Sequence, residues 1–167
     1  MPIPPSIILL PGNMCDERLW RGESGAIVNT LGARAPVRDA DFSRDDSIAA
    51  MAARTLEAIP GPIIAIGFSM GAIVAVEMWV QAPERIAGLV LLGYYRRAAL
   101  GRITVPVLLG CGVEDTLCPP AWHADWAARI PDATLFTVPG AGHMLPLEAP
   151  LTLARHLDEW LTAKDIA

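Results

Sequence analysis

The sequence predicts an α/β fold, in which a mostly parallel sheet of about six strands is covered by helices on both faces. Short aliphatic runs alternate with longer amphipathic segments from one end of the chain to the other. The runs lack polar alternation, which is typical of strands that are buried on both faces. A length of 167 residues, with no internal repeat and no linker, fits a single domain over residues 1–167.

Six aliphatic runs are the predicted strands, and turn residues separate them from the helical segments. The runs are residues 7–10, 35–37, 63–67, 87–92, 105–109 and 133–138. Predicted helices occupy about residues 17–31, 44–59, 70–81, 120–130 and 150–161. Asp16 is the expected cap of the first helix, and Ser43 with Asp46 three residues later resembles a capping box for the second.

The composition excludes several classes of function. Charged residues make up 19% of the chain and the net charge is −5, with no run of Lys or Arg, so we expect no nucleic-acid partner. The apolar window 62–80 is interrupted by Gly67, Ser69 and Gly71, which favours a buried strand and helix over a membrane span.

Three cysteines, Cys15, Cys111 and Cys118, are an odd number and lie far apart in the sequence. This pattern predicts reduced thiols and a cytoplasmic location. The chain has no CxxC motif and no Cys/His spacing typical of a metal site, so we expect neither a metal nor a cofactor.

The segment Gly67-Phe68-Ser69-Met70-Gly71 is a G-x-S-x-G motif between a predicted strand and a predicted helix. A serine on so sharp a turn takes a strained backbone, and small residues two positions before and after it let the turn close. The N-terminus of the following helix favours developing negative charge at the same point. The motif predicts a nucleophilic Ser69, and the alternative is a glycine-rich turn with an idle serine.

An activated serine needs a base, and the chain has three histidines. His123 and His156 lie in predicted helices, where a partly exposed position without a role is expected. His143 follows the last predicted strand in a glycine-rich loop, which is where a side chain can be presented at the edge of the sheet. Glu114 and Asp115, after the fifth predicted strand, are both candidates for the carboxylate that orients the base.

These residues come in the order Ser69, acid, His143, each after a different parallel strand. Parallel sheets place their sites outside the carboxyl ends of the strands, so all three should meet at one edge.

The motifs resemble those of the α/β-hydrolase superfamily, over about residues 5–162. They are the G-x-S-x-G motif, a G-x-x-D pattern at 112–115 followed by Pro119, and the segment GAGHMLPLEAP at 140–150. The segment LLPGNMCD at 9–16 is similar to the oxyanion loop of the family, with Pro11 in place of the usual His. The resemblance is to small bacterial carboxylesterases related to the pimeloyl-carrier methyl esterases.

The resemblance implies a role for each matching residue. Ser69 is the nucleophile, His143 the general base and acid, and Asp115, which fills the D of G-x-x-D, orients His143. The backbone N–H groups of Asn13 and Met70 form the oxyanion hole.

Two departures from the family pattern shape the expected site. The chain starts at the strand that bears the oxyanion loop, without the family's first two strands, and only residues 93–102 stand where a helical lid is usually inserted. We therefore expect an open groove and exposed apolar surface that favours self-association. The expected substrate pocket is lined by Met14, Tyr94, Leu117, Met144 and Leu145.

The leading interpretation is a serine esterase for small or activated esters, working through an acyl-enzyme without a cofactor. A thioesterase or acyltransferase would use the same residues. Hydroxynitrile lyases also keep a serine at this position, whereas haloalkane dehalogenases place an Asp there. A non-catalytic scaffold that binds a ligand or partner is the alternative from another class.

Overall fold

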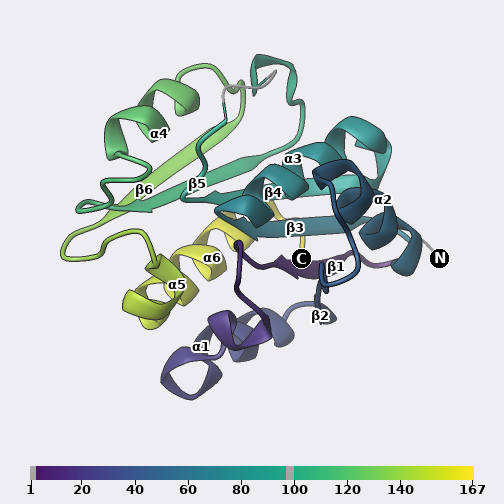
Figure 1. Cartoon of the computed structure of the whole chain (residues 1–167), viewed down its shortest axis with the longest axis horizontal. Helices are drawn as coiled ribbons and strands as arrows, with labels where there is room; N and C mark the ends of the chain where they lie inside the picture. Colours follow the sequence, from purple (N-terminus) through teal and green to yellow (C-terminus); the bar gives the residue numbers. More distant parts are fainter. Residues whose placement is uncertain (1–2, 97–99) are drawn as a thin grey trace.

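The computed structural model describes residues 3–96 and 100–167, and it confirms the predicted α/β class (Figure 1). One sheet of six strands has the order β2-β1-β3-β4-β5-β6, and all neighbouring strands are parallel. The strands are β1 (Ser6–Leu10), β2 (Val37–Asp39), β3 (Ile63–Phe68), β4 (Ile86–Leu92), β5 (Val107–Gly112) and β6 (Ala133–Val138).

Six α-helices and three short 3-10 turns connect the described strands. The helices are α1 (Gly22–Gly32), α2 (Ile48–Ala58), α3 (Met70–Gln81), α4 (Pro120–Ala127), α5 (Leu145–Glu148) and α6 (Pro150–Lys164). The 3-10 turns are η1 (Glu17–Trp20), η2 (Pro83–Arg85) and η3 (Leu100–Arg102).

Helices cover both faces of the sheet, as predicted. Helices α2, α3 and α4 lie on one face of the sheet and pack against Ile8 and Leu10 of β1 (Figure 1). Helices α1 and α6 lie on the other face and pack against Ile7 and Leu9. Successive residues of a strand point to opposite faces, so a strand covered on both sides is apolar at every position. This explains the unbroken aliphatic runs in the sequence.

One predicted helix start is wrong. The cap of α2 is Ser47, whose Oγ accepts from the N–H of Ala50 at 3.2 Å, and not Ser43. The N–H of Ser43 instead donates to the side chain of Asp41, which places Ser43 in a turn before the helix. Asp16 does accept from the N–H of Arg18, but it caps the 3-10 turn η1.

The first predicted helix is divided in two. Glu23, Ser24 and Gly25 have φ values of 41°, 60° and 76°, which a right-handed helix does not contain. The chain therefore changes direction between η1 and the regular part of α1.

The connection between β4 and β5 is short. Strand β4 ends at Leu92 and β5 begins at Val107, and η3 lies between them. The expected short connection over 93–102 includes residues 97–99, which lie outside the described residues. Within the part of the chain that the structure describes, no cap domain covers the sheet (Figure 1).

None of the described helices combines the length and the apolar character that crossing a bilayer requires.

Candidate active site

Ser69 lies between β3 and α3 with a strained backbone. Its φ is 53° and its ψ is −113°, in a region that a residue with a side chain rarely occupies. Its N–H donates to the carbonyl of Leu92 at the end of β4, which fixes the turn against the sheet. The turn therefore holds Ser69 at the carboxyl edge of the strands.

The two glycines of the motif are required by close backbone contacts. A Cβ on Gly67 would lie 2.3 Å from the carbonyl oxygen of Gly71, and a Cβ on Gly71 would lie 2.0 Å from that of Leu10. Both distances are far below van der Waals contact. The G-x-S-x-G spacing is thus the spacing that lets β1, β3 and the start of α3 approach at this turn.

His143 lies in the loop after β6 and faces Ser69. Its Nε2 is 3.3 Å from Ser69 Oγ. The N–H groups on either side of it, those of Gly142 and Met144, donate to the two carboxylate oxygens of Glu148 at 2.7 and 2.8 Å. Glu148 therefore fixes the backbone that carries His143.

Asp115, in the loop after β5, is the acidic residue that contacts His143. One of its oxygens lies 2.8 Å from His143 Nδ1, while the other accepts from the N–H groups of Leu117 and Cys118 at 2.9 and 2.8 Å. Asp115 is 3% exposed, whereas Glu114 is exposed to solvent. Of the two carboxylates that the residues alone left open, Asp115 is the one in contact with His143.

The hydrogen bonds define which nitrogen of His143 can act as a base. An ionised carboxylate only accepts, so His143 Nδ1 carries a proton and donates it to Asp115. In the neutral ring, Nε2 is then free to accept the proton of Ser69. The ends of β3, β5 and β6 bring these three side chains together, as expected at the carboxyl edge of a parallel sheet.

The structure is similar to several solved hydrolases. It matches MGS-MChE2, an α/β-hydrolase enzyme from the metagenome of lagoon sediments at Mar Chica, Morocco, with a TM-score of 0.85 and 17% identity, covering 98% of this chain and 93% of that one. The chain has an α/β-hydrolase fold. A thermophilic esterase from Thermogutta terrifontis matches this fold with a TM-score of 0.82 and 18% identity, covering 98% of this chain and 92% of the esterase.

Carboxylesterase CesB from Bacillus subtilis matches the same α/β-hydrolase fold with a TM-score of 0.79 and 16% identity, covering 96% of this chain and 84% of CesB. No protein-family model and no curated protein sequence matched the chain. The structural comparisons therefore establish the fold. An inference about the reaction has to rest on the residues of the site.

One of the two expected oxyanion donors, Met70, directly follows Ser69 in the chain. Met70 is the first residue of α3, and Asn13 lies in the loop after β1. Within the described residues, neither backbone N–H is used in a hydrogen bond. Both residues line a cavity of about 580 Å³ that also includes Gly12 and Met14.

The expected pocket residues fall into two groups. Met14 and Leu117 are exposed and Met144 is half-buried, and Met14 lines a smaller cavity of about 190 Å³ together with Met144 and Leu147. Tyr94 and Leu145 are buried, so they support the site from below its surface.

Tyr94 belongs to a buried aromatic cluster next to the site. Its ring packs edge-on against Trp126, as does the ring of His123, with centroids 5.2 and 5.1 Å away. Burial raises the pKa of Tyr94 to about 12. His123 is 0% exposed, which corrects the expectation of a partly exposed position: it lies three residues before Trp126, on the same face of α4.

Sequence reasoning did not assign a role to two residues that shape the site. Glu148 was visible in the motif around His143, but its contacts with two N–H groups depend on how α5 folds back. Phe68 packs against His143, with ring centroids 5.1 Å apart, and its position directly before Ser69 is the signal that could have identified it.

One set of side chains among residues 3–96 and 100–167 could hold a metal ion. Single ligand atoms of Asp115, Cys118 and His143 all lie within 4.8 Å of one another. No spacing motif indicates this set, because His143 is distant along the chain from the other two.

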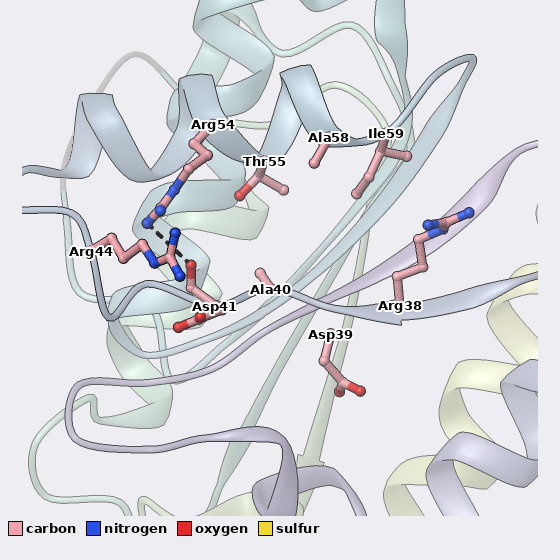
Figure 2. Close-up of a pocket in the computed structure, with 9 residues that line it drawn as sticks. All are labelled: Arg38, Asp39, Ala40, Asp41, Arg44, Arg54, Thr55, Ala58 and Ile59. Carbon is pink, nitrogen blue, oxygen red and sulfur yellow. Dashed lines mark hydrogen bonds between the residues drawn. The ribbon is translucent and has the colours of Figure 1, made fainter.

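A further cavity, of about 590 Å³, lies against β2 and α2 (Figure 2). Arg44 and Arg54 lie near Asp41 on one side of it, and Arg38 lies on the other side. Ser69, Asp115 and His143 are not among the residues that line it.

Proposed function

We propose that this protein hydrolyses carboxylic esters through an acyl-enzyme intermediate on Ser69. The observation that carries the proposal is the continuous arrangement of Ser69 Oγ, His143 and Asp115, with distances of 3.3 and 2.8 Å. A buried carboxylate, an imidazole and a hydroxyl in this order can remove the proton of the hydroxyl during attack on a carbonyl carbon.

The proposed reaction has two stages. Ser69 Oγ attacks the ester carbonyl while His143 Nε2 takes its proton, and the alcohol leaves with that proton as the acyl-enzyme forms. His143 then removes a proton from water as the water attacks the acyl group, and it gives that proton to Ser69 Oγ as the acid is released. In both stages, the N–H groups of Asn13 and Met70 stabilise the negative charge on the carbonyl oxygen.

The surroundings of Ser69 support small or activated esters as the substrate class. No cap domain covers the described residues, and Met14, which directly follows Asn13, is 97% exposed. An open site encloses little of its substrate, so it discriminates weakly by acyl shape. We also propose the relation to the pimeloyl-carrier methyl esterases, on the motif around His143.

Hydrolysis of p-nitrophenyl esters of increasing acyl length tests this proposal. The parent should turn over the acetate and the short-chain esters, and Ser69→Ala should lose the activity while keeping its circular dichroism spectrum. Turnover of acyl thioesters in preference to oxygen esters would replace the substrate class and keep the mechanism.

A well-folded parent without any turnover would contradict the proposal. The chain would then be a scaffold that binds a ligand or a partner. Equal activity in the parent and in Ser69→Ala would assign the hydrolysis to a contaminant or to another residue.

A further inference from the structure

Cys118 lies directly beside the contact between Asp115 and His143. Its side chain is buried, and its thiol donates to the carbonyl oxygen of Gly93 at 3.1 Å. The proposed hydrolysis has no use for this thiol. Its place next to a carboxylate and an imidazole combines three of the side-chain types that bind divalent transition metals in proteins.

The existing distances are close to those of a metal site. Zinc bonds of about 2.0–2.3 Å in a tetrahedral arrangement place the ligand atoms about 3.4–3.6 Å apart. His143 Nδ1 and the Asp115 oxygen are 2.8 Å apart, and all three ligand atoms lie within 4.8 Å of one another. Shifts of about 1 Å would therefore complete the geometry, which side-chain rotations can supply.

The charges also balance. A divalent cation bound by one carboxylate, one thiolate and one neutral imidazole forms a neutral unit, which a buried position tolerates better than a net charge. The carbonyl oxygen of Gly93, already 3.1 Å from Cys118 Sγ, is placed to be a fourth ligand.

We infer that Asp115, Cys118 and His143 form a binding site for a thiophilic divalent cation such as Zn²⁺, and that the bound cation switches off the proposed hydrolysis. On binding, the thiol of Cys118 releases its proton to solvent. The metal replaces the Nδ1 proton of His143, which moves to Nε2, so the ring stays neutral.

This proton shift is the reason for the inhibition. The inhibition rests on the proposed function, because it concerns the hydrolysis at Ser69. With a metal on Nδ1 and a proton on Nε2, His143 has no lone pair to accept the proton of Ser69. Asp115 also no longer orients the ring. Binding of the metal itself does not depend on any hydrolytic activity.

Titration with Cd²⁺ tests the site directly, because a cadmium–thiolate bond gives a charge-transfer band in the ultraviolet. The parent and Ser69→Ala should both reach saturation at one Cd²⁺ per chain, and Zn²⁺ should displace it. Cys118→Ser should lose the band, whereas the matched variants Cys15→Ser and Cys111→Ser should keep it. A serine hydroxyl can donate to Gly93 as the thiol does, which favours a folded variant.

Asp115→Asn gives a second decision if Cys118→Ser does not fold. It should weaken Cd²⁺ binding by more than about tenfold, since even the outer partners of metal ligands are worth 10–100-fold in affinity. A band that persists in Cys118→Ser, a band that disappears in Cys15→Ser, or an affinity unchanged in Asp115→Asn would overturn the inference.

The hydrolysis assay tests the regulatory part separately. Zn²⁺ should inhibit the parent and Cys15→Ser, with recovery on adding a chelator, while Cys118→Ser should keep its own zinc-free rate. Inhibition of Cys118→Ser equal to that of the parent would overturn it. If the parent hydrolyses no ester, the Cd²⁺ titration still decides whether the site exists.

Discussion

Asp115 shows how a single buried side chain can determine the state of its neighbours. One oxygen is occupied by two N–H groups of its own loop, so only the other oxygen faces His143. This arrangement leaves the carboxylate one orientation and gives His143 one tautomer. The proposed mechanism depends on that tautomer more than on the charge of Asp115.

Asp115→Asn therefore tests whether Asp115 sets the tautomer of His143. The amide NH₂ group would face His143 Nδ1 and favour the tautomer with its proton on Nε2, so turnover should fall by about 10⁴-fold. Steady-state hydrolysis of p-nitrophenyl acetate measures the loss. Glu114→Gln is the matched control and should retain the parental rate, because Glu114 is exposed. Equal losses in both variants would refute the assigned role.

Single residues also mark what sequence reasoning reaches and what it misses. Ser69, Asp115 and His143 each follow a strand, so the parallel sheet was enough to predict that they meet. The burial of His123 was not predicted, although Trp126 three residues later gave the face of the helix. The contact of Cys118 with the site depends on loop geometry that no spacing rule describes.

At the scale of elements, close backbone contacts constrain the turn between β3 and α3. Gly71→Ala would place a methyl group 2.0 Å from the carbonyl oxygen of Leu10. We expect it to lower the free energy of unfolding by about 3 kcal/mol or more, as measured by urea denaturation.

Gly32→Ala is the control for that substitution. Gly32 lies in α1, and an added Cβ there meets nothing within 4 Å. Alanine is the better helix former, so this variant should be stabilised by up to about 1 kcal/mol. If Gly71→Ala were as stable as Gly32→Ala, the close approach of β1 and α3 would have no energetic weight.

Helix α5 has its own effect on the proposed chemistry through Glu148. Glu148→Ala removes both acceptors from the N–H groups that flank His143, and a misplacement of about 1 Å can cost about 100-fold in rate. We expect a lower kcat with little change in KM. Glu159→Ala, on the exposed surface of α6, is the control; a parental kcat in Glu148→Ala would show that the loop holds His143 without it.

The elements themselves were predicted best where turn residues mark their ends. Helix α3 and strand β6 have the predicted bounds. Pro83 stops the helical segment shortly after α3 ends, and turn residues flank β6 on both sides. The start of α2 was misplaced, since Ser43 and Ser47 both suit a cap and only the turn around Asp41 separates them. Residues Glu23–Gly25 turn the chain in a conformation that their sequence does not specify.

At the scale of the whole molecule, the buried His123 links stability to pH. Burial lowers the pKa of His123 below its ordinary value of 6.5. The unfolded chain therefore binds the proton more readily, and the free energy of unfolding should fall as the pH drops below about 6.5. Burial lowers the pKa of His156 as well, so both act in the same direction.

Comparison with His123→Gln isolates the contribution of His123. Thermal unfolding of both proteins should give a constant difference above about pH 7 and a shrinking difference below about pH 6.5, because only the parent pays for protonation of this ring. A difference independent of pH between these values would contradict the account. Any titration of His156 is common to both proteins and cancels.

The overall architecture was predictable because strands and helices alternate, whereas the strand order was not. In the order β2-β1-β3, strand β2 pairs with the outer edge of β1, and β3 pairs with its other edge. This arrangement depends on the side of β1 to which the chain returns after α1. The short connection from β4 to β5 was visible in the sequence as a length, and the structure adds that no cap domain forms in the described residues.

The central claim is that Ser69 is a nucleophile activated by His143, and labelling with a fluorophosphonate tests it most directly. Mass spectrometry of the parent should find one adduct, on the peptide that contains Ser69, and both Ser69→Ala and His143→Ala should remain unlabelled. A folded parent that does not react, or that carries the adduct on another serine, would contradict the account.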